Sequence, residues 1–155
     1  MKIKIFSFGK VKLPFIQDAI SEFESRISKL ATLENVFLKE QPTDKKNIEL
    51  SLKEEEKQIL KIFKPSVTTY LLVENSHQYT SIDFAKRLEN DMAKNGPEVH
   101  FFIGSPYGFS PNVKKVIANH LSLSMMTFTH DMARYLLLEQ VYRSLTIHKN
   151  IPYHN

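Results

Sequence analysis

Cysteine is absent from all 155 residues of this chain. No disulfide can brace the fold, and no thiolate can act as a nucleophile or a zinc ligand. Every mechanism that begins with attack by a cysteine is therefore excluded. A chain without cysteine is compatible with a reducing cytosol, and we expect a cytoplasmic protein.

Long apolar runs and several common catalytic motifs are also missing. No run approaches the roughly 20 residues that cross a bilayer, and the N-terminus alternates lysine with apolar residues, unlike a signal peptide. The six histidines show no zinc spacing, so we expect no metal and no membrane contact. The chain lacks the G-x-S-x-G elbow, the G-x-G-x-x-G fingerprint and the Gly-Lys-Ser/Thr phosphate loop.

Acidic residues are unevenly distributed in this mildly basic chain, whose net charge is +4. Residues 101–130 contain Lys114 and Lys115 but no Asp or Glu. A surface of this kind tolerates an RNA partner, although a buried strand and loop explain it equally well. Four N-terminal lysines have two similar interpretations, as phosphate contacts or as strand-edge charges that oppose aggregation. They are Lys2, Lys4, Lys10 and Lys12.

Apolar runs alternate with helical patterns along the whole chain. Strands are expected at Met1–Phe8, Leu33–Leu38, Val67–Val73, Val99–Ile103 and Leu121–Ser124. Helices are expected at Leu13–Leu30, Ile48–Phe63, Ser81–Ala93, Ser110–Ala118 and Asp131–His148. This alternation predicts one α/β domain, residues 1–155, with a mostly parallel sheet flanked by helices. The loosest stretch is Gln41–Lys46, which we expect to be a mobile loop.

The last predicted helix is apolar on more than one face. Leu136, Leu137 and Leu138 are consecutive, and Val141, Tyr142 and Leu145 continue a wide stripe. Because a surface helix normally buries one stripe, we expect this helix to pack on its own sheet and on a second copy of the chain. An additional layer within the same chain is the alternative.

Two segments near the C-terminus have the character of a ligand pocket. Gly104 and Gly108 follow a predicted buried strand, where open α/β sheets bind ligands and glycine lets a ligand approach the backbone. A plain turn between strand and helix is the equal alternative. The uncharged segment 123–128 is expected to be buried, and its N–H and C=O groups then need partners from a ligand or from neighbouring loops.

The C-terminal segment is rich in groups that bind phosphates and bases. Arg143 pairs with Glu139 at helical spacing, which on its own indicates a surface ion pair. Arginine grips phosphate at two points, and Tyr153 and His154 can stack on an unpaired base. A solvated tail is the alternative, although proline, tyrosine and histidine are unusual in a disordered tail.

Four motifs of the C-terminal third occur together. They are a strand ending in Ile-Gly before a Tyr-Gly turn, then L-S-L-S-x-M-T-F-x-H, L-x-E-Q-x-Y-R and P-Y-H. With the Met-Lys-Ile start and the Gly9-Lys10 turn, the sequence resembles the RlmH (YbeA-type) methyltransferases of the α/β-knot (SPOUT) superfamily. The resemblance covers the whole chain and is most specific in its last third.

The resemblance implies a fold, a reaction and a set of residues. Members are homodimers that bind S-adenosylmethionine in a C-terminal trefoil knot. They methylate N3 of a pseudouridine in a hairpin loop of large-subunit (23S) ribosomal RNA on assembled ribosomes. The implied cofactor contacts are Leu72, Gly104, Leu123, Ser124, Met125, Met126, Thr127 and Phe128. The implied substrate contacts are Arg143, Tyr153 and His154, in the same chain or across the dimer.

This reaction requires the weakly acidic N3 of pseudouridine to lose a proton. Arg143 would stabilise the negative charge that develops on a base carbonyl. His130 or His154 would take the proton, because imidazole titrates near neutral pH, and the sequence does not separate the two. A purely structural role at the start of the last helix is the alternative for His130.

Two positions depart from the family pattern, which usually has Gly-Gly after the strand and Lys before Met-Thr. This chain has Ser105 and Met125 at those positions. One alternative is therefore a ribosome- or RNA-binding protein of the same fold with weakened turnover. Another is an α/β nucleotide- or flavin-binding protein without an RNA substrate. Binding of S-adenosylmethionine separates this last alternative from the others, and turnover separates the enzyme from the binding protein.

Overall fold

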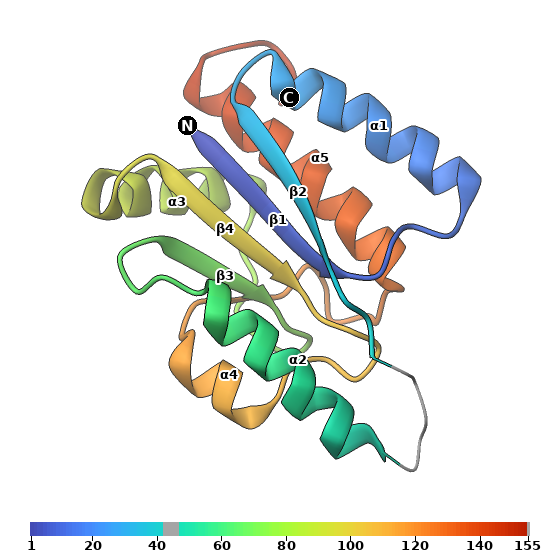
Figure 1. Cartoon of the computed structure of the whole chain (residues 1–155). Coiled ribbons are helices and arrows are strands. Elements are labelled where there is room, and N and C mark those ends of the chain that lie inside the picture. The colour runs from blue at the N-terminus through green and yellow to red at the C-terminus, as the bar shows by residue number, and fades with distance from the viewer. Residues whose placement is uncertain (42–46, 155) are drawn as a thin grey trace.

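The structure, a computed structural model, describes residues 1–41 and 47–154, and these residues form one sheet flanked by helices (Figure 1). The strands are β1 (Lys2–Phe8), β2 (Thr32–Leu38), β3 (Thr68–Leu72), β4 (Glu98–Ile103) and β5 (His120–Leu121). The helices are α1 (Pro14–Ser28), α2 (Ile48–Ile62), α3 (Ser81–Asn95), α4 (Pro111–Val116) and α5 (His130–His148). All strand pairs are parallel, in the order β2-β1-β4-β3-β5. The predicted parallel α/β fold is confirmed, whereas the predicted loop 41–46 lies, apart from Gln41, outside the described residues.

Apolar side chains cover both faces of the sheet. Ile5 and Phe101 belong to a core closed by α1, α3 and α5, whereas Phe6 and Phe102 belong to a second core closed by α2 and α4. In Figure 1, α2 and α4 lie in front of the sheet and α5 lies behind it. Strands buried on both faces explain why β3 and β4 appear in the sequence as continuous apolar runs.

Local sequence signals set several element boundaries. The Thr80 hydroxyl accepts a hydrogen bond from the Asp83 N–H at 3.1 Å and so caps α3, while Gly96 ends that helix with φ +90°. The predicted strand Leu121–Ser124 is shorter in the structure and ends at Leu121. Its continuation is lost because the Ser122 N–H bonds the His77 carbonyl, at 2.9 Å, instead of a neighbouring strand.

Helix α5 lies on the sheet between α1 and α3, and this position explains its wide apolar stripe. Leu137, Leu138, Val141 and Leu145 are all at most 3% exposed within a single chain. The intramolecular layer therefore accounts for these four residues, whereas Leu136 and Tyr142 of the same stripe stay half-buried, and a second copy of the chain against this helix stays a prediction. Among the described helices, α5 included, none is long and apolar enough to span a membrane.

Helix α2 buries only part of the apolar side that its sequence predicts, which consists of Leu52, Ile59, Leu60 and Phe63. Ile59 is buried and Phe63 packs against the second core, but Leu52 and Leu60 are half-buried, and Ser51 and Glu55 are buried in their place. The reason is that this part of α2 meets the segments that follow two strands: Gln58 bonds the Lys39 backbone after β2, and Glu56 accepts from Ser110 after β4. Hydropathy alone does not predict a buried glutamate.

Candidate functional site

A pocket of about 810 Å³ lies at the carboxyl ends of β3, β4 and β5. Leu72, the last residue of β3, pairs with Ile103 of β4 and Leu121 of β5, so three strands end side by side. The loops that follow form the walls, with residues 73–75, 104–109, 122–124 and 126–129. Both the volume and the position at strand ends are typical of small-molecule sites in α/β proteins.

The two glycines of the first wall form a tight turn. A Cβ atom on Gly104 would lie 2.9 Å from the Gly108 carbonyl oxygen, too close for an unshifted backbone. Gly108 has φ +74°, and its N–H donates to the Ser105 carbonyl oxygen at 2.8 Å. The G-x-x-x-G spacing therefore has a structural cause, and the same turn lines the pocket.

The uncharged loop 122–129 forms the opposite wall and was expected to be buried. In the single chain Leu123 and Ser124 are half-buried, but Thr127 and Phe128 are exposed, Met125 is 83% exposed and Met126 is 74% exposed. The prediction of burial is wrong here because the loop leaves the sheet at β5 and no described segment packs over it. Leu123, Ser124, Met126, Thr127 and Phe128 line the pocket, whereas Met125 lies outside its lining.

The backbone of this loop is largely free of intrachain partners. Within the described residues, the N–H groups of segment 122–128 that make a hydrogen bond are those of Ser122, with the His77 carbonyl, and Met126, with the Ser124 hydroxyl, both at 2.9 Å. The Ser122 hydroxyl donates to the Ser124 carbonyl at 2.8 Å. Most N–H groups of the loop are therefore available to a ligand.

His130 is both a helix-terminal residue and a pocket residue. It is the first residue of α5, after the N-cap Thr129, whose hydroxyl accepts from the Met132 N–H at 3.4 Å. It lines the main pocket and also a second cavity of about 220 Å³. The second cavity is further lined by Gly9, Lys10, Lys12 and Asp131, among others.

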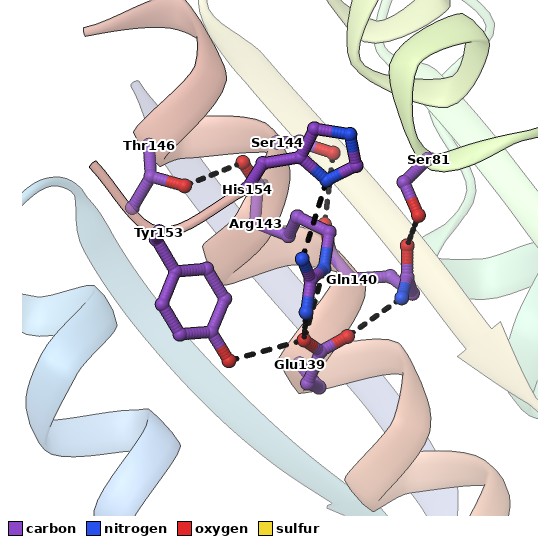
Figure 2. A network of polar contacts seen from close by, with 8 residues as sticks. All are labelled: Ser81, Glu139, Gln140, Arg143, Ser144, Thr146, Tyr153 and His154. Carbon is purple, nitrogen blue, oxygen red and sulfur yellow. Dashed lines mark hydrogen bonds and ion pairs between the residues drawn. The ribbon is translucent and has the colours of Figure 1, made fainter. Parts of the chain in front are cut away.

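Arg143, Tyr153 and His154 form a network around Glu139 at the other end of α5 (Figure 2). The Glu139 carboxylate accepts from Arg143 Nε at 3.0 Å and from the Tyr153 hydroxyl at 3.1 Å. The Arg143 guanidinium lies 4.7 Å from the centre of the Tyr153 ring. The tail is therefore folded back on α5 through residue 154, which is not the behaviour of a solvated tail.

Two consequences follow from the charges in this network. Hydrogen bonds to Glu139 raise the pKa of Arg143, and burial followed by the Glu139 charge raises the pKa of Tyr153, so both stay protonated at neutral pH. Arg143 Nη1 lies 3.2 Å from His154 Nδ1. Since a guanidinium cannot accept, Nδ1 of His154 is the acceptor and its lone pair is occupied.

The predicted catalytic residues fall into two separate groups. His130 and Arg143 are 13 positions apart on α5, which at 1.5 Å per residue is roughly 20 Å. Within one chain, only His130 of the predicted catalytic residues lies at the pocket. Leu72 and Gly104 lie there as expected.

Several lining residues were not predicted from the sequence. Glu74 and Asn75 follow β3, and Tyr107 and Lys114 come from the turn after β4 and from α4. Among the described residues that line the pocket, Glu74 and Lys114 are the ones that carry a full charge. Polar residues directly after a buried strand are a usable signal, because strand ends meet at this edge of the sheet. Within residues 1–41 and 47–154, no three His, Asp or Glu side chains are grouped as a metal site would require.

The N-terminal lysines divide into two pairs. Lys2 and Lys4 lie 3.4 and 3.2 Å from the Glu34 carboxylate, and a hydrogen bond to Glu34 raises the pKa of Lys4. These two lysines are strand residues whose charges are neutralised. Lys10 and Lys12 instead line the second cavity beside His130.

Comparison with known proteins defines the class. The family described as "Predicted SPOUT methyltransferase" matches residues 1–154. A solved structure, a probable methylase family protein from Haemophilus influenzae Rd KW20, aligns over 99% of this chain and 70% of its own with a TM-score of 0.53. At 10% identity this likeness concerns the fold alone. The chain belongs to the SPOUT methyltransferase family.

Relatives that match along their full length narrow the resemblance further. The Ribosomal RNA large subunit methyltransferase H of Parabacteroides distasonis is 36% identical over 156 residues, which is 100% of this chain and 99% of that protein. The protein of the same name from Syntrophotalea carbinolica is 35% identical over 155 residues, with the same coverage. The RlmH resemblance drawn from the motifs is confirmed, and a nucleotide- or flavin-binding protein of another family is set aside.

Proposed function

We propose that this protein methylates N3 of a pseudouridine in a hairpin loop of large-subunit ribosomal RNA on assembled, cytoplasmic ribosomes. The methyl donor is S-adenosylmethionine, and residues 1–155 act as one α/β-knot domain in a homodimer. The observation that carries the proposal is the pocket at the ends of β3, β4 and β5, in a chain whose full-length relatives are named as ribosomal RNA methyltransferases.

The residues of the pocket fit this cofactor. Gly104 offers bare backbone where a Cβ would already collide with Gly108, and the loop 123–128 offers N–H groups that, apart from that of Met126, have no intrachain partner among the described residues. Leu72 and Phe128 form apolar parts of the pocket wall. Met125 lies outside the pocket lining of the single chain, and we expect it to contact the cofactor from the edge of the pocket. When bound, S-adenosylmethionine supplies an electrophilic methyl group, so no metal is needed.

Arg143 is the residue that we expect to stabilise the negative charge on the base. Glu139 and His154 occupy three of its five N–H donors, which leaves two for a carbonyl oxygen. Glu139 and the Tyr153 ring hold the guanidinium in place, so little reorganisation is needed when charge develops. Tyr153 and His154 complete this wall of the substrate site.

A second copy of the chain brings the two groups of residues together. Arg143 is too far along α5 to reach the pocket of its own chain, but a twofold-symmetric dimer can place it at the pocket of the other copy. Exposed apolar side chains at the pocket mouth favour such a contact, because surfaces of this kind are usually covered. They are Met126 and Phe128.

His130 is the better placed of the two candidate proton acceptors. It lines the pocket of its own chain, whereas His154 already uses its Nδ1 lone pair on Arg143. A protonated His154 would give up that contact and place a positive charge beside the guanidinium. We therefore assign the proton from N3 to His130, and the positioning of Arg143 to His154.

The decisive experiment uses labelled S-adenosylmethionine and assembled ribosomes that lack the modification, with nucleoside analysis of the RNA. Label in 3-methylpseudouridine is the expected result. Binding of the cofactor without label would favour the alternative, an RNA-binding protein of the same fold in which Ser105 and Met125 weaken turnover.

Mixing two inactive variants tests the shared site. Arg143→Ala lacks the charge-stabilising residue and Gly104→Ala has a displaced cofactor turn, so at a cofactor concentration near the wild-type Kd each homodimer has little activity. In a mixed dimer one site combines an intact pocket with an intact arginine, and activity returns to about a quarter of wild type at equal mixing. No recovery, with mixed dimers verified by mass spectrometry, would place Arg143 outside the partner's site.

A further inference from the structure

Two consecutive carboxylates of α2, Glu55 and Glu56, lie outside the segment 104–110, most of which lines the pocket. Glu56 accepts hydrogen bonds from the Ser110 hydroxyl at 2.5 Å and from the Asn112 amide at 2.7 Å. Ser110 is also the N-cap of α4, where its hydroxyl accepts from the Val113 N–H at 3.1 Å. Glu56 thus fixes the end of the segment 104–110 at which α4 begins.

Glu55 lies at the beginning of the same segment. It is 3% exposed and has no cationic partner among the described residues. Burial raises the pKa of its carboxyl, and the Ser105 hydroxyl and the Gln41 N–H act in the opposite direction. Ser105 is the residue after Gly104 and is itself 7% exposed.

The contact between Glu55 and Ser105 is close but incomplete. The Ser105 hydroxyl is near enough to lower the pKa of Glu55, yet Oε2 of Glu55 and Oγ of Ser105 both lack a hydrogen bond of good geometry within the described residues. Two neighbouring buried groups without other partners are costly unless they satisfy each other. A small movement of the turn would complete a hydrogen bond from the Ser105 hydroxyl to the Glu55 carboxylate.

We propose that Glu55 is a positioning residue for the cofactor turn, acting through the Ser105 hydroxyl, with Glu56 fixing the other end of the turn. We call Glu55, Ser105 and Glu56 the clamp. In this arrangement Ser105, where the family pattern has glycine, helps to hold the turn and does not weaken the site. A ligand in the pocket presses on the Gly104–Gly108 turn, and the clamp resists its displacement. The inference rests on the proposed function only in naming the ligand as S-adenosylmethionine.

Four variants test the clamp. Glu55→Ala and Ser105→Ala each remove one partner, and Glu55→Gln keeps a hydrogen-bonding group without the charge. Glu54→Gln is the matched control, because Glu54 is a partly exposed residue of the same helix that pairs with Lys57. Purified proteins are compared by hydrogen exchange at the Gly108 amide without ligand, and by calorimetric titration with S-adenosylmethionine.

Loss of either partner should accelerate exchange at the Gly108 amide and weaken cofactor binding about tenfold, with kcat on ribosomes changed less than threefold. Glu55→Gln should retain most of the affinity, and Glu54→Gln should match wild type. The double variant should be no weaker than either single variant, because both remove the same interaction. If Glu55 had a purely structural role, its loss would lower the melting temperature but would not weaken cofactor binding more than it lowers kcat.

Two results separate failure of the clamp from failure of the proposed function. Unchanged exchange and affinity in Glu55→Ala and Ser105→Ala, with wild type binding the cofactor, would overturn the clamp alone. If Glu55→Ala does not fold, Ser105→Ala alone decides between these outcomes. Faster exchange in the variants, with no cofactor binding by wild type, would support the clamp and overturn the proposed ligand.

Discussion

Gly104→Ala is the sharpest single perturbation of the cofactor pocket. The new methyl carbon would lie 2.9 Å from the Gly108 carbonyl oxygen and 3.0 Å from the carbonyl carbon, so the backbone must move by some tenths of an ångström. Forcing an extra methyl group into a packed site costs roughly 1–3 kcal/mol. For a chain of this size, a cost near 2 kcal/mol lowers the melting temperature by roughly 4–8 °C.

The same displacement moves a wall of the pocket. We expect the affinity of Gly104→Ala for S-adenosylmethionine to fall at least about tenfold, which corresponds to ~1.4 kcal/mol. The measurements are thermal unfolding by circular dichroism and calorimetric titration of the cofactor. Both effects should appear together, because they have one cause.

Gly96→Ala is the control for destabilisation without damage to the site. Gly96 has φ +90° at the end of α3, has nothing within 4 Å of a Cβ position and is not part of the pocket lining. It should lower the melting temperature because alanine is strained at this φ, and it should leave cofactor affinity unchanged. If Gly104→Ala binds the cofactor as tightly as wild type, the tight turn does not shape the site and the reasoning is refuted.

Four further outcomes are expected. Arg143→Ala should lower kcat at saturating ribosome by about 10²-fold or more while S-adenosylmethionine affinity stays within about twofold, and full single-turnover methylation by this variant would contradict its role. Burial raises the pKa of Glu55, so its contribution to stability is present below the ordinary carboxyl value and lost as pH rises through the raised pKa. Glu55→Gln should therefore melt higher than wild type at pH 7, by an amount that shrinks as the pH is lowered toward 4. Burial lowers the pKa of His100, so the stability contributed by the neutral ring is present above about pH 6.5 and lost as pH falls through the lowered pKa. The melting temperature of wild type should then fall in mild acid more steeply than that of His100→Gln. Met125→Lys changes a side chain that is 83% exposed, so its melting temperature should match wild type, whereas the salt dependence of ribosome binding should steepen by about one unit in the log–log slope.

The order of elements could be predicted from the sequence, because it depends on local patterns. Ser110 with Pro111, and Thr80 with Gly96, set helix ends through groups that lie a few residues apart. Continuous apolar runs identified β3 and β4 as strands buried on both faces. The carboxyl ends of these strands then indicated where a ligand pocket lies, and Gly104 and the loop after β5 are found there.

The parts that sequence reasoning missed depend on contacts between distant segments. Most of the wide apolar stripe of α5 is buried within the same chain, between α1 and α3, a distinction that periodicity cannot make. Loop 125–129 is exposed because no other described segment covers it, although its composition resembles that of a buried loop. In the sequence Glu55 is one of many charged residues on a polar helix, and only the fold shows that it lies beside Ser105.

The sequence by itself determined the strands, the helices, the glycine turn and the family. Each of these depends on residues that lie close together in the chain or on short motifs that can be recognised directly. Only the tertiary structure decided which side chains share a site. It separated His130 from Arg143 by the length of a rigid helix and joined Arg143 to Tyr153 and His154 by folding back the tail. The physical reason is that chemistry needs atoms within a few ångströms of one another, and such distances are fixed by long-range packing.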